Sequence, residues 1–398
     1  MSTQYSRRGL LLGGAAAFGA GLAGRPFGYA ATAPSARVAI AKCPAYDAGM
    51  LPALTRLFDQ LGGLEGLVKG KTVAIKINMV GQVYYRVGHL PPEDTYWTNP
   101  LLIGAVVHLM GKAGAQRIRV LEGAWSSWDP LEEYMLQANW EPRDILNAAS
   151  NVEFENTNCL GRAKKYARFP VPHGGHMFPA YDLNHSYEDC DVFVSMGKLK
   201  EHATAGVTLS EKNCFGATPI SIYGEGAGVD EPNENPVGGR TFMHSGHRQP
   251  PKSALSENNP SSPRQGGYRI PRIVADIVAA RPVHLAIVDG IKSMAGGEGP
   301  WISTVKPVNP GVLIAGTNCV STDAVAMAVM GFDPMADRGT PPFDGLGFGF
   351  ETCDSTLRLA EELGVGTRDL KRIEVIGTPI REALFSYAAL RPKARPGA

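Results

Sequence analysis

One stretch of the sequence, KLKEHATAGVTLSEKNCFG (198–216), places three lysines and a histidine among apolar residues. Lys198, Lys200 and His202 are spaced by two, so an extended backbone would turn their side chains to the same side. Histidine transfers protons near neutral pH, and a lysine held among other cations can act as a base or nucleophile. We therefore expect these three residues and Lys212 to be catalytic, the alternative being a solvated turn with surface lysines.

A second segment, IKINMVG, ends another expected strand with Lys76 and Asn78. Two strand ends that each present a lysine and a polar partner would form a positive pocket suited to a carboxylate, an enolate or a phosphate. The side chains that we expect to bind substrate are Lys76, Asn78, Glu122, Thr208, Asn213, Asp289 and Glu298.

The glycine-rich segment IVDGIKSMAGGEGPW (287–301) places Asp289 after a buried strand and Glu298 among glycines. Its backbone N–H groups could hold an anion, although the segment lacks the spacing of a P-loop or a dinucleotide fingerprint. The alternative is a plain glycine turn. Trp125 and Trp128, beyond the strand that holds Glu122, could likewise line an aromatic or sugar pocket or belong to the core.

Two H-x-x-H pairs are the candidate ligands of a divalent metal: His173 with His176, and His244 with His247. Both pairs are flanked by glycine or serine in expected loops, where histidines are commonly solvated. The six cysteines contain no C-x-x-C pair, so we expect no iron–sulfur cluster.

Strands and helices alternate around these residues, and this order is typical of an α/β fold with a mostly parallel sheet flanked by helices. Residues 71–81, 100–115 and 117–124 read as strand, helix and strand, and we expect the 190–202 strand to end near Gly197. Parallel sheets bind ligands at the carboxyl ends of their strands. A later helix at 321–332 has Ser321 or Thr322 as its expected N-cap.

The composition indicates a globular chain that binds a small molecule. Of its 398 residues, 44% are hydrophobic, and 39 basic side chains balance 38 acidic ones, a profile that argues against nucleic acid as partner. This length favours two lobes or one elaborated domain. We expect an N-terminal lobe (34–219), a Gly/Pro/Asn-rich lid or interface arm (220–267), a C-terminal lobe (268–386), a tail (387–398), and an active-site cleft between the lobes.

Arg7 and Arg8 precede an apolar, Ala/Gly-rich run from Gly9 to Gly24. This layout is typical of a twin-arginine signal peptide, which we assign to residues 1–33. The run is too short and too glycine-rich for a permanent membrane span. We expect export to the periplasm, with the twin-arginine (Tat) translocon as a transient partner.

The segments VAIKIN, TNPLLIGAVVHLMGKAGAQRIRVLEG, DVFVSMGKLKEHATAGVTLSEKNCFG, LAIVDGIKSMAGGEGP and VSTDAVAMAVMGFDP resemble the domain of unknown function 362 family. The resemblance covers nearly all of the mature chain. Many relatives carry ferredoxin-like cysteine clusters that this chain lacks, so the resemblance implies no such cluster here.

A more distant resemblance links the 191–216 segment to the nickel-pincer lactate racemase family. In that family a strand leads to a catalytic histidine, and a lysine ten positions further holds the cofactor; His202 and Lys212 match these positions. That family keeps a second catalytic histidine after an earlier strand. At the corresponding place this chain has Glu122 and tryptophans instead. The resemblance implies a two-lobed α/β architecture and a cleft at His202, without the nickel cofactor.

These observations together predict an exported enzyme that performs acid/base chemistry on a small anionic or hydroxylated, aromatic or non-aromatic compound. The reaction would be a lyase, isomerase or redox step in which His202 moves the proton. Lys198 or Lys200 would stabilise an oxyanion, and Lys212 would orient or activate the substrate. The competing hypothesis is a non-catalytic periplasmic carrier of a metal or cofactor.

Overall fold

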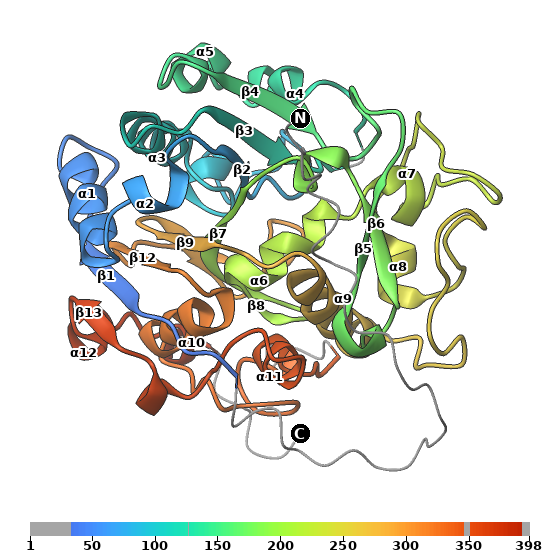
Figure 1. Cartoon of the computed structure of the whole chain (residues 1–398). Helices are drawn as coiled ribbons and strands as arrows, with labels where there is room; N and C mark the ends of the chain where they lie inside the picture. Colours follow the sequence, from blue (N-terminus) through green and yellow to red (C-terminus); the bar gives the residue numbers. More distant parts are fainter. Residues whose placement is uncertain (1–32, 126, 346–350, 392–398) are drawn as a thin grey trace, which may run out of the picture.

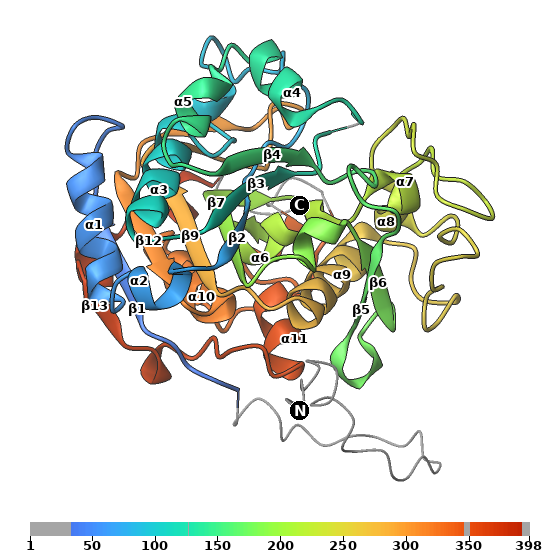
Figure 2. The same ribbon diagram turned by 45° about the horizontal axis from the view of Figure 1, so that its top comes forward.

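A computed structural model describes residues 33–125, 127–345 and 351–391, and it shows one large sheet between two layers of helices (Figure 1). Helices α1 (Met50–Gln60) and α3 (Pro100–Lys112) lie on one face, and α9 (Gly266–Ala280) and α10 (Cys319–Val329) lie on the other (Figure 2). The expected α/β class, with a mostly parallel sheet flanked by helices, is confirmed.

The sheet has nine strands among the described residues, in the order β13-β1-β12-β9-β7-β2-β3-β4, with β8 paired to β7. Its strands are β1 (Val38–Lys42), β2 (Thr72–Lys76), β3 (Arg117–Glu122), β4 (Val152–Asn156), β7 (Val192–His202), β8 (Gly206–Thr208), β9 (Leu285–Gly290), β12 (Val312–Gly316) and β13 (Val375–Gly377). Strands β4, β3, β2, β7 and β9 are parallel in succession, whereas β12 is antiparallel to both β9 and β1. The predicted β2-α3-β3 crossover is present, and its parallel strands end together at one sheet edge.

This sheet is shared by the two halves of the chain that we expected to form separate lobes. Strand β7, from the first half, pairs directly with β9 from the second. Strand β1, near the start of the described residues, lies between β12 and β13 of the second half. Main-chain pairing therefore joins both halves into one sheet, because β1 bridges two C-terminal strands and β9 pairs with β7.

Alternating side chains on the central strands supply two hydrophobic layers, one on each face of the sheet. On β1, Val38 and Ile40 belong to the layer under α9 and α10, whereas Ala39 belongs to the layer under α1 and α3. This two-sided burial is typical of sheets covered by helices on both faces and explains why the strands are nearly continuous apolar runs.

Two local predictions differ from the structure. Strand β7 continues past Gly197 to His202, because β8 pairs with its end and a bridge joins Lys198 to Leu209. Helix α10 begins after Asn318, not at Ser321 or Thr322, since the Asn318 side chain accepts a hydrogen bond from the backbone N–H of Ser321.

The segment 220–267 contains helices α7 (Ile220–Tyr223) and α8 (Thr241–Ser245) and runs into α9. Part of the expected tail also packs on the fold: Tyr387 is fully buried and Arg391 forms an ion pair with Glu201.

The predicted signal peptide lies outside the described residues except for Ala33. Along the described part of the chain, no helix is both long enough and apolar enough to cross a membrane.

The remaining helices and turns are short and connect these elements. They comprise α2 (Glu65–Val68), α4 (Leu131–Gln137), α5 (Pro142–Leu146), α6 (Leu209–Asn213), α11 (Thr356–Glu362) and α12 (Ile380–Ala383), with two-stranded sheets formed by β5 (Ala167–Pro170) with β6 (Ala180–Leu183) and by β10 (Ser293–Ala295) with β11 (Lys306–Val308). Helix α6 matters for the site, because Lys212 lies on it.

Candidate functional site

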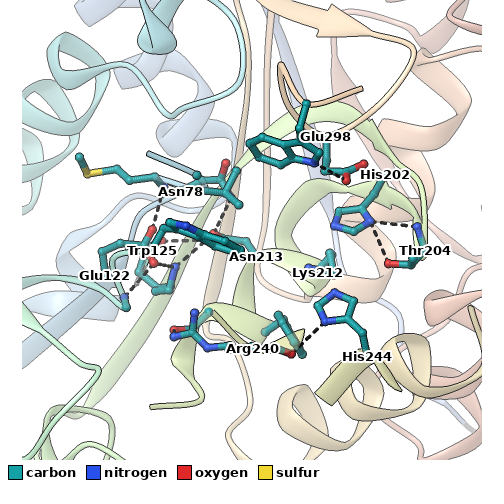
Figure 3. Close-up of a pocket in the computed structure, with 18 of the residues that line it drawn as sticks. Asn78, Glu122, Trp125, His202, Thr204, Lys212, Asn213, Arg240, His244 and Glu298 are labelled. Carbon is teal, nitrogen blue, oxygen red and sulfur yellow. Dashed lines mark hydrogen bonds and ion pairs between the residues drawn. The ribbon is translucent and has the colours of Figure 1, made fainter. Parts of the chain in front are cut away.

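A pocket of about 520 Å³ lies at the carboxyl ends of β2, β3 and β7 (Figure 3). Its lining comes from three distant parts of the chain: the first half, the 220–267 segment and the glycine-rich loop after β10. The lining residues used below are Lys76, Asn78, Gly81, Tyr85, Glu122, Gly123, Trp125, His202, Thr204, Lys212, Asn213, Phe215, Gly216, Arg240, His244, Glu298 and Trp301. The position at the strand ends is where parallel α/β sheets hold ligands.

A buried ion pair between Lys76 and Glu122 forms one wall of the pocket. The two Glu122 oxygens also accept hydrogen bonds from the backbone N–H groups of Met79, at 2.7 Å, and Gly123, at 2.9 Å. The carboxylate is therefore fully engaged with a cation and two amides. This arrangement makes Glu122 and Lys76 a fixed part of the wall, since neither charge is left without a counterpart.

Beside this pair, Asn78 and Asn213 form a hydrogen-bonded amide pair at 3.2 Å. The Asn213 side chain is held further by the Lys76 carbonyl oxygen and by Ser195 Oγ. Asn78 Oδ1, in contrast, is buried and has no hydrogen-bond partner within the described residues. Because an unpaired buried acceptor costs free energy, this atom is available for a donor group of a ligand.

His202 ends β7 and enters the pocket with one nitrogen already engaged. Its Nδ1 accepts the backbone N–H of Thr204 at 3.2 Å, so the neutral ring carries its proton on Nε2. Burial, followed by the charges of Lys212 and Lys200, lowers the pKa of His202 well below its ordinary value. His202 is therefore neutral at pH 7 and offers an Nε2–H donor.

His244, on α8, also lines the pocket, and its hydrogen bond is of the opposite kind. Its Nδ1 lies 3.0 Å from the carbonyl oxygen of Arg240, which can only accept, so the proton is on Nδ1. Burial is the main cause that lowers the pKa of His244 to about 4. At neutral pH its Nε2 therefore carries a lone pair and can accept a proton.

Arg240 supplies a buried cation that has no acidic ion-pair partner within the described part of the chain. Its Nε donates to the Thr218 carbonyl oxygen at 2.6 Å, and its Nη2 donates to Asn158 Oδ1 at 2.7 Å and to the Gly216 carbonyl oxygen at 3.2 Å. No hydrogen bond occupies Nη1 among the described residues. Burial lowers the pKa of Arg240 to about 10, which still leaves it charged at neutral pH.

Lys212 is the second cation of the pocket, and its amine has neither a hydrogen bond nor an ion pair among the residues that the structure describes. Its Nζ lies 4.4 Å from the centre of the Phe215 ring. Burial is the main cause that lowers its pKa to about 7, and the charges of Arg240 and Lys76 act in the same direction. A large fraction of the Lys212 amine is therefore neutral at pH 7.

Glu298 closes the pocket from the glycine-rich loop. Its Oε2 accepts the backbone N–H of Ala203, next to His202, at 2.9 Å, and its Oε1 accepts the Trp301 indole N–H at 2.9 Å. A Cβ at Gly81 would lie 2.5 Å from the Trp301 ring, so glycine is needed for this close packing. Trp301 is 44% exposed and, with Trp125, gives the pocket an aromatic rim.

Lys198 and Asp289, which we predicted to be catalytic and substrate-binding, lie outside the pocket lining. They form a fully buried ion pair at 2.9 Å. Tyr46 donates to Asp289 at 2.8 Å, and Lys198 also donates to the Tyr46 hydroxyl oxygen and to the Glu93 carbonyl oxygen. Asp289 lies on the neighbouring strand β9, so its carboxylate neutralises the charge of Lys198 within the core.

Lys200 and Thr208 are also outside the lining. Lys200 Nζ donates to the main-chain oxygen of Glu298 at 2.8 Å, and burial lowers its pKa to about 7. Thr208 precedes α6, and its buried hydroxyl has no hydrogen-bond partner in the part of the chain that the structure describes. The two-residue spacing thus puts Lys198, Lys200 and His202 on one side of β7, but only His202 reaches the pocket.

The candidate metal ligands do not converge. His176 Nε2 lies 3.1 Å from the Leu359 carbonyl oxygen, and His247 contacts Glu225 at 3.2 Å, whereas His244 faces the pocket and His173 lies outside its lining. Within residues 33–125, 127–345 and 351–391, no group of three or more His, Cys, Asp or Glu side chains could hold a metal ion. The six cysteines are free thiols.

Arg240 and Trp301 are pocket residues that the sequence analysis did not assign to a site. Arg240 is in a polar segment, where an isolated arginine reads as a surface residue, and its burial depends on partners such as Asn158. Trp301 is the last residue of the glycine-rich segment 287–301, and the sequence analysis gave it no role. The pocket that results combines two neutral histidines of opposite tautomer with two cations that have no acidic ion-pair partner among the described residues.

Comparisons with known proteins identify a family and leave the reaction open. A family model described as "Domain of unknown function (DUF362)" matches residues 73–328, which include most of the pocket lining. A stretch of 186 residues, 46% of this chain, is 29% identical to the thylakoid-associated protein sll1697 of Synechocystis sp.. The chain spans about half the length of that relative, since the match covers 50% of it.

Proposed function

The chain belongs to the DUF362 family, whose description names no reaction, and from its pocket we propose that it is an enzyme that transfers a proton to and from a small anionic substrate. The reaction class is that of an isomerase or lyase acting at a carbon next to a carboxylate. His244 is the base, the His202 Nε2–H hydrogen-bonds to the oxygen on which negative charge develops, and Arg240, together with the protonated fraction of Lys212, binds the anion.

The observation that carries this proposal is the pair of opposite tautomers. His202 Nδ1 accepts the Thr204 N–H, and His244 Nδ1 donates to the Arg240 carbonyl oxygen. The pocket therefore contains one Nε2–H donor and one Nε2 acceptor at the same pH. His244 Nε2 can take a proton as a base, and the His202 Nε2–H can donate a hydrogen bond to the oxygen on which negative charge develops.

The charge balance supports an anionic substrate. Glu122 is neutralised by Lys76 and two amides, whereas neither Arg240 nor Lys212 has an acidic partner among the described residues. Removal of a proton next to a carboxylate generates an enolate, and preformed cations in a buried site stabilise such charge without reorganisation. The unpaired Asn78 Oδ1 would accept a hydrogen bond from a substrate hydroxyl or amine.

The test is proton exchange with solvent. The purified chain is incubated in D₂O with a panel of 2-hydroxy, 2-amino and 2-oxo acids, and ¹H NMR follows loss of the signal from hydrogen on the carbon next to the carboxylate. Enzyme-dependent loss is the expected result. Binding of panel members without any exchange would instead favour the competing function, a non-catalytic carrier that uses the same cationic pocket.

We also propose that the protein is exported by the twin-arginine pathway. The support is the Arg7-Arg8 pair before an apolar, Ala/Gly-rich run. Cell fractionation of a producing bacterium would test this directly. Arg7→Lys combined with Arg8→Lys should leave the protein in the cytoplasm, and unchanged export of this variant would contradict the proposal.

A further inference from the structure

Lys212 differs from the other two buried lysines around the pocket in what its amine contacts. Lys76 is paired with Glu122, and Lys200 donates to the Glu298 main-chain oxygen. Lys212 Nζ lines the pocket and lies over the Phe215 ring, with no hydrogen bond or ion pair in the described part of the chain. The Lys212 amine therefore faces the cavity, and no hydrogen bond or ion pair from the described residues holds it.

The groups around Lys212 would recognise a specific kind of carbonyl compound. Arg240 Nη1 has no hydrogen bond among the described residues and can bind a carboxylate. The His202 Nε2–H can donate to a carbonyl oxygen. Trp125 (Figure 3) and Trp301, both in the pocket lining, give an apolar rim that would fit a flat or aromatic substituent.

We infer that Lys212 is a nucleophile that forms a Schiff base with a 2-oxo acid, held by Arg240 through its carboxylate. This inference rests on the proposed function only in using the same pocket, and it adds covalent chemistry to proton transfer. The lowered pKa of Lys212 is consistent with it, because a neutral amine is the reactive form.

The step balances without an oxidant or a reductant. The Lys212 Nζ lone pair attacks the carbonyl carbon and forms the C–N bond, while the His202 Nε2–H hydrogen-bonds to the carbonyl oxygen. His244 Nε2 carries the two amine protons, one after the other, from the nitrogen to that oxygen. The C–O bond then breaks, one molecule of water leaves, and the nitrogen lone pair forms the C=N bond.

Reductive trapping tests the inference on the full chain. The protein is incubated with pyruvate or phenylpyruvate and then with sodium borohydride, whose hydride adds to the imine carbon and fixes the adduct. Peptide mass spectrometry should find the adduct on Lys212, with Lys76 and Lys200 unlabelled as internal controls. Lys212→Arg and Lys212→Met should reduce the labelled fraction at least about tenfold, with circular dichroism confirming that both variants fold.

A second comparison tests the role of Arg240. Arg240→Gln should lower trapping of pyruvate at least about tenfold while changing trapping of benzaldehyde, which has no carboxylate, much less. Arg240→Lys provides a charged control that lacks the planar fork. Equal effects on both compounds would overturn the assigned carboxylate site.

The outcomes separate this inference from the proposed proton transfer. Adduct on Lys212 supports the inference whether or not solvent exchange is observed. Absence of adduct, or labelling spread over Lys76, Lys200 and surface lysines, overturns it. Solvent exchange without any adduct would leave the proposed function standing and remove only the covalent step.

Discussion

His202 and His244 enter the same pocket with opposite hydrogen-bonding patterns. His202 Nδ1 accepts a backbone N–H of Thr204, and His244 Nδ1 donates to the carbonyl oxygen of Arg240. The backbone therefore selects the tautomer of each ring, and the two Nε2 atoms differ in role although both rings are neutral at pH 7. This difference leads to the first prediction.

Replacing His202 with Gln should lower the rate of solvent exchange by about 10²–10³-fold, the usual contribution of one positioned donor to a developing oxyanion. The ¹H NMR assay measures this rate, and a thermal melt checks the fold. His108→Gln is the matched control, because His108 is exposed and remote from the pocket lining. Full exchange activity in the His202 variant would show that this ring takes no part in the reaction.

Lys212→Met should raise the free energy of unfolding at pH 7 by about 1 kcal/mol, since it removes a buried amine that resists protonation. The folded pKa is about 7 against an ordinary value of 10.5, so the unfolded state binds more protons between these values. The wild-type free energy of unfolding therefore rises between pH 7 and pH 10.5 as the Lys212 amine loses its proton in the unfolded state. The stability difference between the variant and the wild type should shrink over that range.

Urea denaturation of both proteins at pH 7 and pH 10 provides the measurement. The pKa of Lys200 is also lowered to about 7, mainly by burial and in part by the charge of Lys212, so the comparison reports the change at both lysines. A constant difference between variant and wild type at the two pH values would argue that the Lys212 amine is charged in the folded protein.

Lys198→Met should destabilise the protein by about 3–5 kcal/mol, because Asp289 would be left as a buried charge without its cation. The double variant Lys198→Met with Asp289→Asn should recover part of this loss, since it removes the unpaired charge. Chemical denaturation measures both effects. Normal stability combined with lost exchange activity would instead return Lys198 to a catalytic role.

Gly123→Ala should weaken binding of carboxylate ligands by about tenfold or more, since small displacements of a positioned group cost much of its effect. A Cβ at Gly123 would lie 2.5 Å from Arg240 Nη2 and 2.5 Å from the Gly216 carbonyl oxygen, so the guanidinium must move. Gly104→Ala, on α3, is the control, because its Cβ would meet nothing within 4 Å. Calorimetric titration with pyruvate compares the two variants.

The elements themselves follow largely from local sequence. The 3.6-residue spacing of apolar residues and Pro100 predict α3, and continuous apolar runs predict β2, β3 and β9. The β2-α3-β3 order was enough to predict a parallel sheet with ligands at its strand ends. His202, Lys76 and Asn78 were identified for this reason, because their positions depend on where a strand ends, whereas Lys212, on α6, was identified from the lysine-rich segment that contains it and from its spacing to His202.

The environment of each side chain was decided by tertiary structure. Lys198, Lys200 and His202 have equivalent spacing on β7, yet they meet Asp289, the Glu298 main chain and the open pocket respectively. Arg240 and His244 reach the pocket from a segment that reads as a polar loop. Burial and pairing depend on contacts between residues far apart in the sequence, so spacing identified the reactive residue types while only the folded sheet selected which of them share a cavity.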